Sequence, residues 1–115
     1  MGGDGQLVAT SPSGKTYCIV FKGDRGRVGT DGRQVFRLYD NAPQPFPANF
    51  IEQTKQRSSR VQQRVKQVKS KQVVPVLAFT EAIVNLDRNP ISGVWVVAVS
   101  ELRRLLLQQE TQKQH

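Results

Sequence analysis

Asp4 and Lys22 are the residues whose types and positions best suit hydrolytic chemistry. Asp4 precedes and Lys22 follows a segment with the composition of a β-hairpin, in which residues 7–9 and 17–21 flank a Ser-Pro-Ser-Gly turn. In metal-dependent nucleases, two carboxylates hold Mg²⁺ while a lysine orients or activates the attacking water. Lys22 also ends an apolar strand, where an idle charge is costly. The simpler alternative is a lysine that emerges into solvent at a strand end, and on these residues alone it is the better one.

Other kinds of catalytic site find little support. Residues 9–16 fit the loose pattern of a phosphate-binding loop, which requires a helix at its last residues, but Thr16 leads into a β-forming run and the pattern indicates a hairpin turn. Cys18 is the only cysteine, which excludes an intrachain disulfide and a cysteine-based zinc site, and we expect it to be a small buried hydrophobe. His115 is the only histidine and lies in a polar tail, so histidine acid–base catalysis has no candidate.

The charge of the chain predicts a polyanionic partner. Its net charge is +8 and its pI is near 10.3. Residues 55–71 contain no acid, and they hold seven cations: Lys55, Arg57, Arg60, Arg64, Lys66, Lys69 and Lys71. The other ten basic residues nearly balance the nine acids, so the excess charge lies on one element. A solvated helix face is the alternative interpretation. We expect phosphate contacts, mostly independent of sequence and more to DNA than to RNA, from Lys55, Arg57, Arg60, Arg64, Lys66 and Lys69.

The N-terminal half of the chain reads as an antiparallel β-meander. The hairpin is followed by turn signals at residues 23–26 and 29–32, and then by an alternating strand at 34–39. Pro43, Pro45 and Pro47 predict irregular structure over residues 41–47. Asn49 and Glu52 then form a capping-box pattern that begins a long helix ending near Ser70. The inward face of that helix is predicted to consist of Ile51, Thr54, Ser58, Val61, Val65 and Val68.

The C-terminal half adds two buried strands and a last helix. Residues 73–79 and 94–99 are nearly continuous apolar runs, and Ser100 is placed to cap a final helix. Residues 108–115 are predicted to be a frayed polar tail. The predicted order is β-β-β-α-β-β-α in a single α/β domain spanning residues 1–115. No apolar run reaches the length of a membrane span, so we expect no membrane partner, and the lone cysteine suits the cytoplasm.

Residues 11–26 resemble the hairpin of nuclease-related domains. There, a Pro-x-Gly turn leads into a strand that ends in acid-x-Lys and is followed by a glycine-containing loop. The later order is also similar: a Gln- and Lys-rich helix, a Val-Pro-Val strand, a Gly-Val-x-Val-Val run and a leucine-rich terminal helix. The resemblance covers roughly residues 3–107 and implies a restriction-endonuclease-like core of the PD-(D/E)xK type. It implies Lys22 and Asp4 as catalytic residues, with Asp4 and Asp24 as ligands of Mg²⁺.

The departures from that pattern put cleavage in doubt. The acid of acid-x-Lys is replaced by Val20, and the earlier aspartate falls on Asp4 or Gln6, depending on the register. A family glutamine corresponds to Gln53 or Gln56, and the family's N-terminal helix is absent. Because Mg²⁺ binds mainly through carboxylates and water, the site loses both charge and a ligand. We therefore expect a nucleic-acid-binding domain with impaired catalysis. The alternatives are an active Mg²⁺-dependent endonuclease with rearranged carboxylates, and a protein–protein or homo-oligomerisation module.

Overall fold

The chain is a mixed α/β domain built on one six-stranded sheet. The computed structural model describes residues 4–66 and 73–112, and side chains as far as residues 64 and 110 of those segments. Its elements, in chain order, are β1 (Gly5–Thr10), β2 (Thr16–Thr30), β3 (Val35–Tyr39), β4 (Ala42–Gln44), α1 (Phe50–Lys66), β5 (Val73–Val84), β6 (Trp95–Ala98), the 3₁₀ helix η1 (Val99–Glu101) and α2 (Leu102–Gln112). This order confirms the predicted succession of elements and adds β4.

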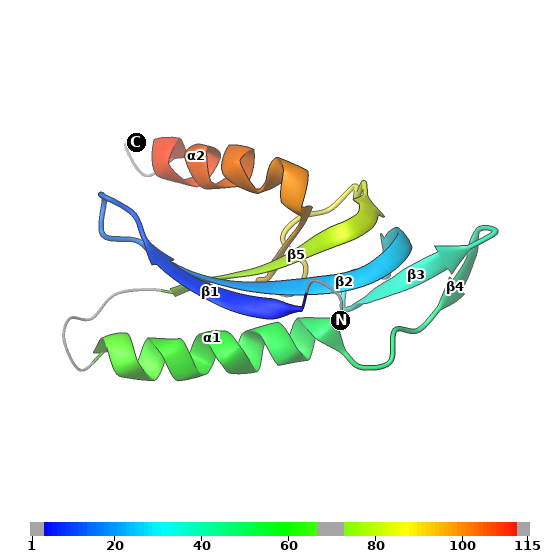
Figure 1. Cartoon of the computed structure of the whole chain (residues 1–115), viewed down its shortest axis with the longest axis horizontal. Coiled ribbons are helices and arrows are strands. Elements are labelled where there is room, and N and C mark those ends of the chain that lie inside the picture. The colour runs from blue at the N-terminus through cyan, green and yellow to red at the C-terminus, as the bar shows by residue number, and fades with distance from the viewer. Residues whose placement is uncertain (1–3, 67–72, 113–115) are drawn as a thin grey trace.

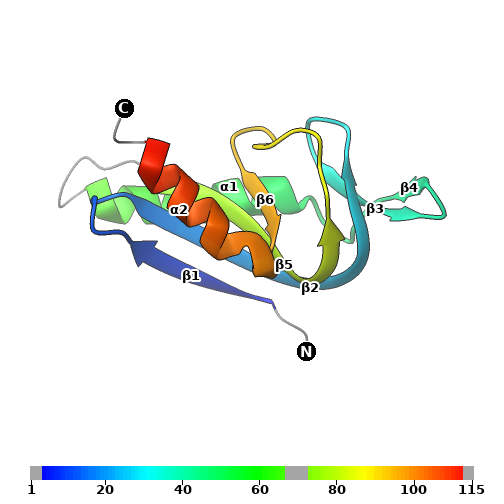
Figure 2. The ribbon, with the colours of Figure 1, turned by 90° about the horizontal axis from the view of Figure 1, so that it is seen from above.

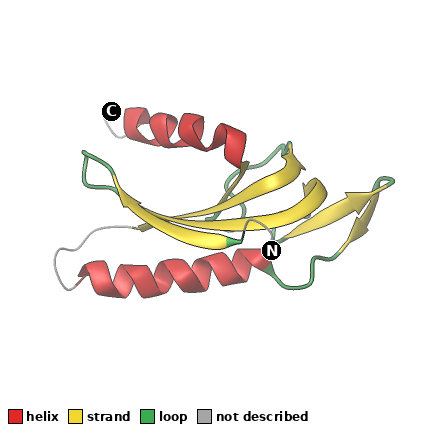
Figure 3. Ribbon diagram, in the orientation of Figure 1, coloured by secondary structure: helices red, strands yellow, loops and turns green. Residues whose placement is uncertain are grey.

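The sheet is antiparallel in its first part and parallel in its second. Its order is β4-β3-β2-β5-β6, and β1 pairs with β2 as well. The pairs among β1 to β4 are antiparallel, whereas β2, β5 and β6 run parallel. A parallel pair needs a crossover, and α1 lies within the connection from β2 to β5. Helices α1 and α2 lie on opposite faces of the sheet (Figures 1 and 3), and α2 crosses over β2 and β5 (Figure 2).

The turn predicted at residues 23–26 is wrong, because these residues continue β2. This strand has 15 residues and pairs with β5 along both of its halves, with a register shift between Lys22 and Arg25. Two residues of β2, Gly23 and Asp24, oppose the single residue Thr80, which is the pattern of a β-bulge. The glycines that suggested a turn therefore accommodate a bend inside one long strand.

The irregular segment predicted at residues 41–47 is also partly wrong. A two-residue turn joins β3 to β4, and its central residues Asp40 and Asn41 have φ values of 51° and 65°. Two positive φ angles define a type I′ turn, which matches the twist of a hairpin, and Asp and Asn tolerate that conformation. Pro43 pairs with Leu38 in the outermost strand, where a missing N–H does not interrupt the sheet.

Helix α1 follows the sequence prediction closely over its described part. The Asn49 side chain accepts a hydrogen bond of 3.1 Å from the N–H of Glu52, which confirms the predicted N-cap. The predicted inward residues that the structure describes are all buried: Ile51, Thr54, Ser58 and Val61. The Val65 side chain, Val68 and the predicted end near Ser70 lie outside the described residues.

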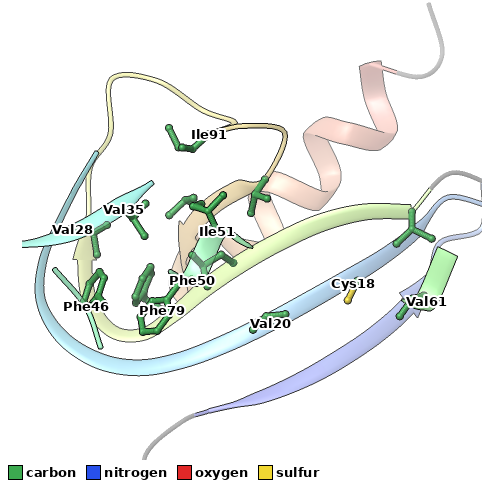
Figure 4. Packing of buried hydrophobic residues seen from close by; sticks show 14 residues of the cluster. Cys18, Val20, Val28, Val35, Phe46, Phe50, Ile51, Val61, Phe79 and Ile91 are labelled. Carbon is green, nitrogen blue, oxygen red and sulfur yellow. The ribbon is translucent and has the colours of Figure 1, made fainter. Parts of the chain in front are cut away.

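Alternate residues of β2 serve two cores, one under each helix. Cys18 and Val20 belong to the larger cluster, on the α1 face, whereas Tyr17 and Ile19 belong to the smaller cluster, which includes Leu105 of α2. Burial of Cys18 confirms the expected small hydrophobe, and its pKa is raised by that burial. Figure 4 shows the larger cluster, with the rings of Phe46, Phe50 and Phe79 at one end, and with Val20 and Cys18 of β2 leading away from them toward Val61.

Two predictions about the C-terminal helix are wrong. Ser100 is not its cap, because the backbone enters a 3₁₀ turn after Ala98 with no side-chain cap. Residues 108–112 of the predicted frayed tail extend the helix instead, and residues 113–115 lie outside the described residues. The Tyr17 hydroxyl donates a 2.8 Å hydrogen bond to the Glu110 carboxylate, and Gln109 is buried. Hydrogen bonds from Ser13 and Tyr17 lower the pKa of Glu110. The contact between α2 and the first hairpin therefore weakens only in acid, when this carboxylate is protonated.

Candidate nucleic-acid interface

The long strand β2 leaves one edge unpaired near its middle. Its pairing with β1 stops at Phe21, and its pairing with β3 starts at Arg27. Among the described residues, no strand therefore borders residues 22–26, which we call the fork, on that edge, and the β-bulge interrupts their pairing with β5 on the other edge. Bulges of this kind are over-represented beside functional sites, because they change the direction of a side chain. Figure 1 shows β1 and β3 beside successive parts of β2.

Lys22 lies inside the fork and does not emerge freely into solvent. Its side chain is only 13% exposed, and its Nζ lies 4.6 Å from the centre of the Phe50 ring. The carboxylate of Asp4 is 3.9 Å from this Nζ and also accepts a 2.8 Å hydrogen bond from the N–H of Gly23. The strand-end alternative for Lys22 is therefore wrong, and Asp4 and Lys22 do come together as the sequence suggested.

Arg37 of β3 is a second cation at the fork. Its guanidinium lies 3.8 Å from Asp24 and 5.6 Å from the centre of the Phe46 ring. The aliphatic part of Arg37 lies against Gly26, where a Cβ would come within 3.2 Å of it. The ring centres of Phe46 and Phe50 lie 4.8 Å apart in a stacked pair, so the two cations Lys22 and Arg37 contact neighbouring rings of one aromatic pair. Arg37 was not predicted from the sequence, although it lies two residues after the buried Val35 and therefore on the same face of the strand.

The residues at the fork do not fit a two-carboxylate magnesium site. The acid of the family pattern falls on Val20, which is 2% exposed and packed in the core. Gln6 lies opposite Val20 in the β1–β2 register. Its side chain is an amide, so it supplies no carboxylate either. Asp4 and Asp24 each pair with a cation already. Among the described residues, no group of three His, Cys, Asp or Glu side chains is placed to hold a metal ion.

Three exposed arginines share one flank of α1. At 100° per residue, Arg57, Arg60 and Arg64 lie within about 60° of one another around the helix. The Arg57 guanidinium donates a 3.0 Å hydrogen bond to the Gln6 side chain, which places this flank beside β1. None of the three forms an ion pair with a side chain that the structure describes. We call these three residues the arginine stripe.

Of the other cations predicted on this helix, Lys55 is the one with a described side chain, and it lies elsewhere on α1. Lys55 is two residues before Arg57, hence on the opposite flank, and its ammonium lies 3.5 Å from the Glu52 carboxylate. The side chains of Lys66 and Lys69 lie outside the described residues. The structure thus brings together three of the predicted cations, Arg57, Arg60 and Arg64. The hydrogen bond from Arg57 to Gln6 connects them with β1, the strand that Asp4 precedes at the fork.

Of the two glutamines suggested by the family resemblance, Gln53 is the one directed toward the interior. Its Oε1 atom is buried and accepts no hydrogen bond, whereas Gln56 is exposed. Gln53 lies one turn before Arg57, on the same flank of α1. A buried acceptor without a donor is unusual in a folded protein.

Neither the helix of residues 50–66 nor that of residues 102–112 is long and apolar enough to cross a membrane. Comparison with family models, curated protein sequences and solved structures gives no match, so the interface is defined by its own geometry.

Proposed function

We propose that this chain is a nucleic-acid-binding domain with a restriction-endonuclease-like core, which binds the phosphate backbone of DNA without cleaving it. The observation that carries the proposal is the arginine stripe, three exposed guanidinium groups on one helix flank with no acidic partner among the described side chains. Guanidinium groups match the geometry of phosphate oxygens, and their side chains lose little freedom on binding. The net charge of +8 adds long-range attraction toward a polyanion.

The order of elements and the position of Lys22 support the family resemblance. A β-hairpin leads through a helical crossover to a parallel strand, and Lys22 lies at an interrupted, aromatic-lined part of the sheet. The contact between Asp4 and Lys22 is compatible with that resemblance. The absence of an acid at Val20 is the reason for proposing binding without cleavage.

Salt dependence tests the proposed binding. We expect a duplex DNA of arbitrary sequence to bind with a log Kd that rises by about 0.9 per tenfold increase in salt for each phosphate neutralised. Fluorescence anisotropy with labelled DNA and with RNA of the same sequence measures this slope, and DNA is expected to bind more tightly. An affinity that does not change between low and moderate salt would contradict the proposal.

Restoring the missing acid tests the loss of cleavage. Val20→Glu completes the acid-x-Lys pattern, but it places a carboxylate in the core under α1. Because burying an unpaired charge is costly, we expect the free energy of unfolding to fall by about 2–4 kcal/mol, with no gain of Mg²⁺-dependent plasmid cleavage. Val20→Gln is the uncharged control of similar size. Cleavage that requires Mg²⁺ and disappears in Lys22→Ala would show instead that the site is active.

Self-association is a second candidate function, favoured by the edge strand β1. Within the described part of the chain this strand pairs with β2 alone; it carries no charge and exposes Leu7 and Val8 by 50% and 44%. Such an edge can pair with the same edge of a second copy. A mass that rises with protein concentration in analytical ultracentrifugation, together with no affinity for nucleic acid, would favour this function over the first.

A further inference from the structure

The Asp4 carboxylate is held at the fork in the way that proteins hold a bound anion. One oxygen accepts a hydrogen bond of 2.8 Å from the backbone N–H of Gly23, and the other lies 3.9 Å from Nζ of Lys22. A backbone N–H together with an ammonium group is a common combination for binding phosphate. The carboxylate is a group of the chain itself, so it shows which chemistry the fork accepts.

The two sides of this contact differ in how firmly they are fixed. Lys22 is in the middle of β2, is 13% exposed and rests on the Phe50 ring. Asp4 precedes the first residue of β1, has a side chain that is 61% exposed, and is followed by Gly5. The cation is therefore fixed in place, whereas the carboxylate can leave with little disturbance of the fold.

Arg37 supplies a further donor near the same place. Its buried Nε has no hydrogen-bond acceptor, and this atom lies 3.4 Å from the position that a Cβ of Gly26 would occupy, at the end of the fork. A buried N–H without an acceptor is costly, and a small shift of the Arg37 side chain is enough to offer it to a ligand or water oxygen. The fork thus contains an ammonium, a backbone N–H and a guanidinium with a donor to spare.

We infer that the fork is a binding subsite for one phosphodiester group, and that the Asp4 carboxylate occupies this subsite in the free protein and is displaced by the ligand. The identity of the phosphodiester as part of a nucleic acid rests on the proposed function. The arginine stripe leads to the fork through the contact between Arg57 and Gln6, so one strand of nucleic acid can reach both. Asp4 is then a competitor of the ligand and not a ligand of Mg²⁺.

The test is a titration followed by NMR at the Gly23 amide, at constant ionic strength. Inorganic phosphate is the first probe, and an oligonucleotide without terminal phosphates is the second. Removing the negative charge that competes for the subsite is expected to tighten the binding of both probes about fivefold in Asp4→Asn. Asp40→Asn removes the same charge from the β3–β4 turn and keeps a residue that tolerates positive φ, so its affinities should equal those of the wild type.

Several outcomes would overturn this inference. They are a Gly23 amide that neither probe moves, an affinity in Asp4→Asn that is unchanged or lower, or a shift caused by Mg²⁺ that Asp4→Asn abolishes. Lys22→Gln should lose the response to both probes while keeping the dispersed spectrum of a folded protein. Failure of the proposed function has a different signature, because the oligonucleotide then binds no variant while inorganic phosphate still moves Gly23.

Discussion

Replacing Arg57, Arg60 and Arg64 together by glutamine is expected to weaken the binding of duplex DNA about 10²- to 10³-fold at about 0.1 M salt. Each arginine that neutralises one phosphate contributes about 0.9 to the slope of log Kd against log salt, so the slope should fall by about 2.7. The three side chains are exposed and have no acidic partner in the described part of the chain, so their charge is fully available to a ligand. Fluorescence anisotropy at four or more salt concentrations measures both quantities.

Two matched variants identify the cause of that loss. Lys55→Gln removes a cation from the opposite flank of α1, where Glu52 already pairs with it, so the affinity for DNA should change little. Replacing the three arginines by lysine keeps the charge but loses the planar arrangement of guanidinium donors, so most of the salt slope should remain. If the triple glutamine variant binds DNA as the wild type does, the arginine stripe is not the interface. Circular dichroism should show that each variant keeps its helix content.

Phe79→Ala is expected to lower the free energy of unfolding by about 3–5 kcal/mol. Phe79 lies in β5, is 0% exposed, and is the largest fully buried side chain in the described part of the core. Its ring centre is 5.7 Å from that of Phe46 and 6.2 Å from that of Phe50, the two rings that carry Arg37 and Lys22. The cavity left by the substitution therefore lies directly beneath the fork.

Chemical denaturation at neutral pH measures that loss. Phe79→Leu keeps most of the apolar volume and should cost clearly less, because the size of the cavity sets much of the penalty. The folded Phe79→Ala variant should also bind phosphate more weakly at the fork, since the Phe46–Phe50 pair loses its support. A loss below about 1 kcal/mol would show that the three rings do not form the central packing contact of the domain.

Local signals in the sequence were sufficient for the presence of both helices, for the start of α1 and for most of the strands, but not for the ends of α2. Asn49 and Glu52 give the start of α1, because a side-chain cap needs only residues close in sequence. The continuous path of β2 through Gly23 and Gly26 was not predictable in this way. It depends on pairing with β5, more than fifty residues later, and tertiary pairing overrides the local preference for a turn.

The candidate interface was predictable only in part, for the same reason. Composition gave the cluster of cations on α1, and helical geometry separates Lys55 from the arginine stripe once the buried face is known. Proximity of Asp4 and Lys22 follows from the hairpin register. Arg37 reaches the fork only through the pairing of β3 with the far half of β2, which the predicted turn at residues 23–26 had hidden.

Under the proposed function, the edge of β2 that no described strand covers serves as part of the sheet and as a binding surface at once. Binding residues usually lie on loops, and a loop must lose conformational freedom when it closes on a ligand. Residues 22–26 belong to the central strand, which neighbouring strands fix both before and after this segment. A ligand at this edge meets donors that are already in position, so the entropic cost of ordering them has been met during folding.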